Sequence, residues 1–176
     1  MKKWVPALLA SVVFAMATAQ ADKSAGDVVD DSTVNASVKA ALIGNKTTKA
    51  HDINVETYKG VVQLSGFVDT AAEKDEAAKV AAGVSGVKSV NNSISIGGKT
   101  SMGTKLDDTV MTGKVKAALM DASNVKSGQI NVETKSGVVQ LSGFVDSAAM
   151  KDKAGTVAAG VSGVKEVQNV LVVRTN

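Results

Sequence analysis

The segment GVVQLSGFVD occurs twice in this chain of 176 residues, at positions 60–69 and again at positions 137–146. Sliding the sequence against itself by 77 positions aligns residues 31–96 with residues 108–173 without an insertion, and more than half of the aligned residues are identical. A gapless duplication of this length indicates two similar domains. Because a domain of about 66 residues buries only about 60% of its unfolded-chain surface, we expect each one alone to be marginally stable.

Each repeat begins with apolar residues at helical spacing. They are Val34, Val38, Ala41 and Leu42 in the first copy, and Met111, Val115, Ala118 and Leu119 in the second. One apolar stripe predicts an amphipathic helix. Asp31 or Ser32 is the expected N-cap in the first copy, and Asp108 or Thr109 in the second, because short polar side chains bind the free amides of a first turn.

A β-hairpin is predicted after this helix. Residues 53–57 alternate between apolar and polar, the pair Lys59-Gly60 follows, and residues 61–68 form a second β-rich run. Ser136-Gly137 occupies the same turn in the second copy. A glycine within the second strand, at Gly66 and Gly143, indicates a bulge or a close approach of two backbones.

A second helix and a last strand complete the repeat. Thr70-Ala71-Ala72-Glu73 has the pattern of a capping box, which the second copy lacks because Met150 replaces the acid. Gly83 and Gly86 end the helix, and apolar residues from Val87 to Ile96 predict the strand. The order helix, strand, strand, helix, strand predicts an α+β fold in which two helices pack on a small three-stranded sheet.

The N-terminus has the pattern of a secretory signal peptide. Lys2 and Lys3 precede an apolar run at 4–17, and Ala19-Gln20-Ala21 supplies small residues for cleavage after Ala21 or, alternatively, after Ala19. The run is too short to span a bilayer. We expect residues 1–21 to be removed on export to the periplasm and residues 22–30 to form a mobile lead-in.

Composition excludes several classes of protein. The chain has no cysteine, so it has no disulfide, no thiolate metal site and no cysteine-linked lipid. Loss of the signal peptide removes two of the 20 basic residues and leaves 18 against 17 acidic ones, with Tyr58, Phe67 and Phe144 as the remaining aromatics. A nucleic-acid binder normally needs a basic stripe or stacking aromatics, so we expect no nucleic-acid partner.

No pattern of residues identifies a reaction. The segment GGKT at 97–100 ends like a phosphate-binding loop but lacks the first glycine, and the Gly-, Ser-, Thr- and Lys-rich stretch 97–107 is expected to be a flexible linker. His51 is the single histidine, and Gly128 replaces it in the second copy. We therefore expect a non-enzymatic protein without catalytic residues, cofactor, metal site or small-molecule substrate.

Taken together, the order of elements, the LSGFVD second strand and the GV-x-x-V-x-N third strand resemble the BON domain of bacterial envelope proteins. Two such domains behind a cleavable signal are similar to the osmotically inducible periplasmic proteins with tandem BON domains. The resemblance implies a periplasmic protein of osmotic or envelope stress that contacts phospholipid membranes or other envelope components. It assigns geometric roles to Gly66 and Gly143 in the second strand and to Gly86 and Gly163 before the third. Without a lipid-bearing cysteine, membrane contact should be peripheral.

The second copy carries the better candidate for such contact. Its candidate residues are Met111, Lys114, Lys116, Met120 and Lys126, of which only Lys116 has a lysine counterpart on the first helix of copy one, Lys39. Lysines near an anionic bilayer contribute about 1 kcal/mol each, which predicts weak, salt-sensitive binding, reinforced by avidity if both domains reach one surface. An ordinary solvated helix edge explains the same charges.

The sequence is also compatible with two other functions. A chaperone-like protein would hold unfolded or outer-membrane clients on apolar strand faces, and residues 170–173 are apolar on both faces of their predicted strand. A structural adaptor in an envelope complex is a third reading. We expect the chain to be a monomer.

Overall fold

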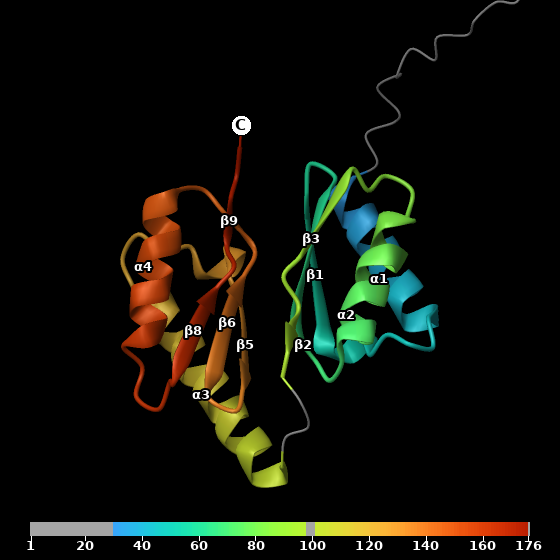
Figure 1. Cartoon of the computed structure of the whole chain (residues 1–176). Coiled ribbons are helices and arrows are strands. Elements are labelled where there is room, and N and C mark those ends of the chain that lie inside the picture. Colours follow the sequence, from blue (N-terminus) through green and yellow to red (C-terminus); the bar gives the residue numbers. More distant parts are fainter. Residues whose placement is uncertain (1–29, 98–100, 176) are drawn as a thin grey trace, which may run out of the picture.

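The computed structural model describes residues 30–97 and 101–175. The predicted signal peptide and almost all of the predicted lead-in fall outside these ranges, as do the linker residues 98–100. Two domains of the same α+β fold stand side by side, with their sheets toward each other and their helices on the outside (Figure 1).

The first domain follows the predicted order of elements. It contains α1 (Asp31–Gly44), the 3-10 helix η1 (Ala50–Asp52), β1 (Ile53–Tyr58), β2 (Val61–Val68), α2 (Ala71–Ala82), β3 (Ser89–Asn92) and β4 (Ser95–Ile96). The second contains α3 (Met102–Asp121), η2 (Ser127–Gln129), β5 (Asn131–Lys135), β6 (Val138–Ser142), β7 (Phe144–Val145), α4 (Ala148–Ala159), β8 (Glu166–Asn169) and β9 (Val172–Val173).

Each sheet is mixed. β1 and β2 form the predicted antiparallel hairpin, and β3 and β4 run parallel to β2 on its other side, so that β1 is an edge strand. The second domain repeats this pairing with β5, β6 and β8, while β7 pairs with β9. The third strand position is split in two in both domains, where one continuous strand was predicted.

Each core lies between a sheet and its two helices. Val34, Val38 and Leu42 of α1 are fully or almost fully buried against β1, β2 and α2, and Val115 and Leu119 occupy the matching positions in the second domain. The predicted capping box is present, because Thr70 accepts a hydrogen bond from the Glu73 amide while Glu73 accepts one from the Thr70 amide. Ser147 caps α4 without such a box.

The predicted N-caps of both first helices are wrong. Asp30 occupies the N-cap of α1 and Ser101 that of α3. The carboxylate of Asp31 instead accepts hydrogen bonds from the amides of Lys59 and Gly60, at 2.6 and 2.8 Å, in the β1–β2 turn. Asp108 binds the β5–β6 turn in the same way. A carboxylate that accepts two backbone amides fixes the hairpin to its helix, which a local capping rule does not anticipate.

The linker is shorter than the sequence indicates. α3 begins at Met102 instead of near residue 108, because the Ser101 side chain accepts a hydrogen bond from the Thr104 amide and Met, Lys and Leu are good helix formers. α3 therefore has 20 residues, against 14 in α1. Its first turns extend below the rest of the second domain in Figure 1.

The two domains pack through the central strands β2 and β6. The Gly143 amide donates to Gln63 Oε1 at 2.8 Å, and the Gly66 amide donates to Gln140 Oε1 at 2.6 Å. Ser65 and Ser142 bond to each other at 2.8 Å between these two contacts. Because each contact has its counterpart 77 residues away, the interface has an approximate two-fold symmetry, and its glutamines are completely buried.

A glycine in each domain lets the chain of the second strand lie close to another stretch of backbone in the same domain. Gly66 and Gly143 adopt φ of +114° and +124°, and an added Cβ would lie 2.2 Å from a carbonyl oxygen, of Asp52 and of Gln129 respectively. Gly86 and Gly163 also have positive φ, before the third strand. The predicted close approach of two backbones in the second strand is therefore the observed geometry.

Candidate functional site

The outward side of α3 carries an unusual number of exposed apolar residues. Met102, Leu106, Val110 and Met120 are 80, 70, 58 and 71% exposed. At 3.6 residues per turn these four positions share one face of the helix, together with Gly113 and Ala117. Val115 and Leu119 on the opposite side fill the core. α3 is thus apolar on two sides, of which the core covers one.

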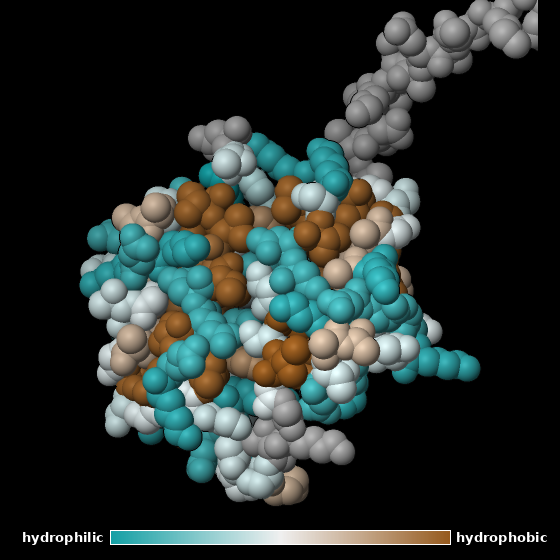
Figure 2. All heavy atoms as spheres, viewed as in Figure 1, coloured by the Kyte–Doolittle hydropathy of each residue, from teal (hydrophilic) through white to brown (hydrophobic). Residues whose placement is uncertain are grey.

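Lysines border this outward face. Lys105 and Lys116 lie along one edge. Lys114 lies along the other, between Asp107 and Asp121, and all three lysines are exposed. None of them is ion-paired with a carboxylate among the residues that the structure describes. In the view of Figure 2, hydrophobic atoms form several separate patches with hydrophilic atoms between them. This side of the molecule therefore presents no single large apolar surface.

The predicted contact residues fall in different places. Lys114, Lys116 and Met120 lie on or beside the outward face. Met111 is half-buried against the core of the second domain, next to Gly163, so its side chain is not part of that face. Lys126 precedes η2 and donates to Asp146 at 2.6 Å, away from α3. Met102 and Leu106 were not predicted, because their stretch has the composition of a linker. Val110 was not predicted either, although it precedes Met120 at helical spacing.

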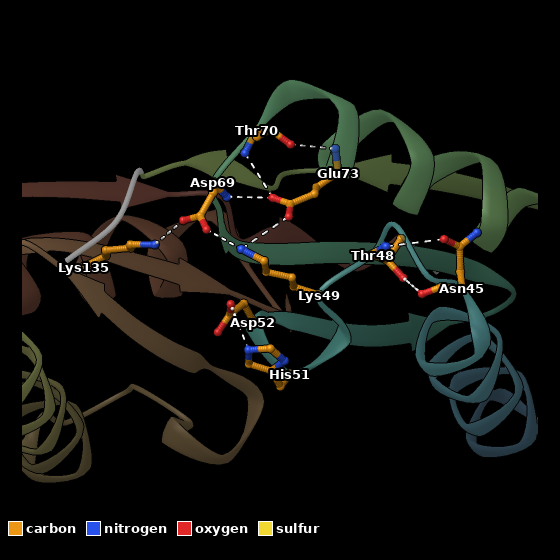
Figure 3. Close-up of polar contacts among 9 residues, drawn as sticks. All are labelled: Asn45, Thr48, Lys49, His51, Asp52, Asp69, Thr70, Glu73 and Lys135. Carbon is orange, nitrogen blue, oxygen red and sulfur yellow. Dashed lines mark hydrogen bonds and ion pairs between the residues drawn. The ribbon is translucent and has the colours of Figure 1, made fainter.

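A second feature is a charged cluster at the junction of the domains (Figure 3). Lys49 is ion-paired with Asp69 and lies 3.5 Å from Glu73, and Lys135 of the second domain reaches Asp69 at 3.6 Å. The hydrogen bond from Lys49 holds the pKa of Asp69 below its usual value, and the charge of Lys135 acts in the same direction. For Glu73, burial opposes ionisation, but two backbone amides and Lys49 lower the pKa overall.

The other end of the interface has the same layout with different residues. Asp146 pairs with Lys126 and with Arg174 at 3.0 Å, and hydrogen bonding to Lys126 lowers its pKa. Arg174 also lies over the ring of Tyr58, which packs on Phe144 with 5.6 Å between ring centroids. Each end of the interface thus holds one aspartate between two cations. At the first end one of the cations, Lys135, comes from the opposite domain, whereas at the second end both cations belong to the same domain as the aspartate.

Beside the Lys49 cluster lies a half-open cleft of about 780 Å³. Its walls come from both domains: Lys49, His51, Asp52, Phe67 and Asp69 on one side, and Lys105, Asp108, Thr109, Thr112 and residues 132–135 on the other. Burial raises the pKa of the Glu133 carboxyl in this cleft; the hydrogen bond from Asn54 opposes the rise and the charge of Asp52 adds to it. This volume is in the range of protein ligand sites.

Residues 30–97 and 101–175 contain no cluster of three or more His, Cys, Asp or Glu side chains arranged to hold a metal ion. None of the helices in these ranges combines the length and the hydropathy needed to cross a bilayer.

Comparison with known proteins identifies the repeated unit. The sequence profile of the BON domain matches residues 30–98 and 107–175, which correspond to the two structural repeats. The chain belongs to the BON-domain family. Its tandem BON domains share the duplicated α+β fold described above, and their order helix, strand, strand, helix, strand agrees with the family resemblance seen in the sequence.

Three BON-domain relatives cover most of the chain. The osmotically-inducible protein Y of Escherichia coli K12 is 45% identical over 148 residues, which span 83% of this chain and 74% of that protein. The 21 kDa hemolysin of Actinobacillus pleuropneumoniae is 35% identical over 85% of this chain and 77% of its own length. The outer membrane lipoprotein DolP of Haemophilus influenzae is 30% identical over 94% of this chain and 86% of its own length.

Proposed function

We propose that this tandem BON protein is an exported, non-enzymatic stress-response protein of the bacterial envelope, which binds an anionic phospholipid surface through the outward face of α3. The stress and envelope parts of the proposal rest on relatives named as osmotically inducible and as an outer membrane lipoprotein. The signal-peptide pattern at residues 1–21 supports export to the periplasm.

The observation that carries the lipid part is the apolar face of α3 bordered by lysines. A helix with one apolar and one basic side lies in the plane of a membrane interface, with its apolar residues about 5–10 Å deep. Met102, Leu106 and Val110 form such a side over the first half of a helix about 30 Å long. Its core-facing residues stay packed, so this contact needs no unfolding of the domain.

Charge would provide the selectivity for anionic lipid. Lys105, Lys114 and Lys116 contribute about 1 kcal/mol each near an anionic surface, and salt screens this attraction over about 8–10 Å. Because the sequence has no cysteine to which a lipid could be attached, we expect binding to be reversible and peripheral.

The first domain does not offer an equivalent face. At the aligned positions α1 has Thr33 for Val110 and Ser37 for Lys114, and it keeps Lys39 and the exposed Ile43. The docked domains therefore favour a single membrane-binding helix over avidity between two independent modules.

Vesicle flotation tests the proposal. The chain from Asp22 onward is mixed with vesicles of phosphatidylcholine alone or with one third phosphatidylglycerol, at low and at physiological salt. We expect flotation with the anionic vesicles only, weakened by salt. The variant Lys114→Glu/Lys116→Glu should lose it, while the matched change Lys39→Glu in α1 should not. If the double variant floats as well as the native chain, or if salt does not weaken flotation, the proposal that α3 binds the lipid surface is contradicted.

A further inference from the structure

The outward face of α3 carries a highly exposed methionine near each end. Met102 is 80% exposed and Met120 is 71% exposed. The two residues are 18 positions apart, which is five complete helical turns, so they lie on one line along the helix. This line runs on the side of the face that Lys105 and Lys116 border. Thioether groups therefore lie at both ends of the surface to which the lipid contact is assigned.

The other methionines of the second domain are protected by its core. Met150 is 7% exposed, and Met111 is half-buried against the same core. The remaining two of the six methionines, Met1 and Met16, lie in the predicted signal peptide. In the chain from Asp22 onward, highly exposed methionine is therefore confined to the outward face of α3.

In the first domain, an isoleucine occupies the position that corresponds to Met120. This residue is Ile43, and its exposed fraction of 73% almost equals the 71% of Met120. Both first helices thus end with an exposed apolar side chain, but only the one in α3 contains sulfur. An aliphatic side chain would bury a similar apolar area against lipid, so lipid contact alone does not account for the thioether.

In the chain from Asp22 onward, methionine sulfur is the group that mild oxidants attack first. The sequence has no cysteine, and its single tryptophan, Trp4, lies in the predicted signal peptide. Hydrogen peroxide transfers one oxygen atom to the thioether sulfur as the O–O bond breaks, and the second oxygen leaves as water with both hydrogens. The sulfur loses the two electrons that the peroxide gains. The product, methionine sulfoxide, is polar and disrupts apolar contacts.

We propose that Met102 and Met120 are oxidant-sensitive modification sites, whose conversion to sulfoxides releases α3 from an anionic phospholipid surface. This regulation depends on the lipid contact proposed above. A sulfoxide loses the favourable burial of a methionine side chain, which corresponds to roughly tenfold weaker binding. The lysines keep their charges and the core methionines are shielded, so the protein stays folded when it dissociates. Methionine sulfoxide reductases reverse the oxidation.

Peroxide treatment followed by flotation tests this proposal. The chain from Asp22 onward is treated with hydrogen peroxide, its sulfoxides are located by peptide mass spectrometry, and flotation is measured over a series of anionic vesicle concentrations at low salt. We expect oxidation of Met102 and Met120 before Met111 and Met150, because oxidation follows exposure. Binding should weaken roughly tenfold or more, with an unchanged far-UV circular dichroism spectrum. Treatment with the two reductases, one for each sulfoxide epimer, should restore it.

The variant Met102→Leu/Met120→Leu separates oxidation of the outward face from other effects of peroxide. Because leucine is apolar and similar in size, the variant should bind as the native chain does and should keep its binding after peroxide. Met111→Leu is the matched control and should lose binding on oxidation.

Two results overturn the proposed regulation while the lipid contact stands. The native chain with sulfoxides at both exposed positions binds as tightly as before, or the double leucine variant loses its binding as well. If the untreated native chain does not bind the vesicles, the lipid contact itself is contradicted, and the regulation with it.

Discussion

The two domains share register, core positions and hairpin turns, but differ in what their first helices present to the surroundings. On its outward side α1 has small and polar residues apart from the exposed Ile43, and its Asn35 side chain donates to the Val55 carbonyl of β1. α3 is six residues longer and has an apolar outward side bordered by lysines. The two copies thus share their packing and differ in the residues that they expose. These differences are the reason why the proposed lipid contact is assigned to the second domain.

The interface between the domains is likewise alike in the two copies at its centre and different at its ends. Its centre is symmetric, with Gln63 and Gln140 each binding a glycine amide of the other domain. Its ends are not, because Tyr58 in one domain aligns with Lys135 in the other, and Gly97 with Arg174. Symmetry is kept where buried polar groups must be satisfied and is lost at the exposed rim.

The largest effect is expected at the strand glycines, where the domains should be equally sensitive. Gly66→Ala and Gly143→Ala each bring a Cβ to 2.2 Å from a carbonyl oxygen at positive φ. We expect each to lower the free energy of unfolding by about 3 kcal/mol or more, measured by urea denaturation. Gly113→Ala is the control, since nothing lies within 4 Å of its Cβ and alanine favours a helix. Unequal losses would show that the two strands are not equivalent.

The buried glutamines should follow. Gln63→Ala leaves the Gly143 amide and the Val170 carbonyl without partners, and Gln140→Ala does the same to the Gly66 amide and the Ser93 carbonyl. An unsatisfied buried group costs about 1–3 kcal/mol, so we expect a loss of about 2 kcal/mol in each variant. Small-angle scattering should also show a larger radius of gyration as the domains separate. A variant with native stability and size would contradict the docked arrangement.

Replacing the aspartates that bind the hairpin turns should destabilise the two domains by different amounts, because one aspartate is more deeply buried than the other. Asp108 is buried and Asp31 is only partly so, although both bind two turn amides. Asp108→Ala should therefore cost about 1–2 kcal/mol in urea denaturation, and Asp31→Ala less, because water replaces the lost partner more easily. The reverse order would mean that the hairpin of the first domain depends more on its helix.

The smallest effect concerns pH. Because burial raises the pKa of Glu133 in the folded chain, the folded state binds this proton more tightly than the unfolded state. Its ionisation therefore lowers stability as the pH rises from the unfolded pKa through the folded one, and neutralisation restores it. Glu133→Gln should be slightly more stable than the native chain at pH 7 and should lose this slope in thermal melts from pH 4 to 8. A variant that is less stable at pH 7 would contradict this account.

Much of the fold could be predicted from local rules. The turns at Lys59-Gly60 and Ser136-Gly137, the capping box at Thr70 and the two core stripes depend on residues close in sequence, so their patterns are visible there. The N-caps were misplaced because Asp31 and Asp108 bind turns 28 and 29 residues away, and no local pattern reports such a contact.

The site was predicted only in part. Lys114 and Lys116 are exposed as expected, whereas Met111, which aligns with the buried Val34 of the first domain, is half-buried against the core. The docking of the domains was not predictable, since Gln63 and Gln140 occupy strand positions that would suit solvent equally well. Identical polar residues in both copies of the strand, QLS at 63–65 and at 140–142, were the available signal.

The central claim, that α3 and not α1 meets the membrane, can be tested with one label placed in two positions. The native chain has no cysteine, so Leu106→Cys and Ile43→Cys each give a single site for an environment-sensitive dye on an exposed apolar position of the first helix of a domain. With anionic vesicles at low salt, we predict a blue shift of the dye at position 106 and none at position 43. A shift of equal size at both positions, or at position 43 alone, would contradict the account.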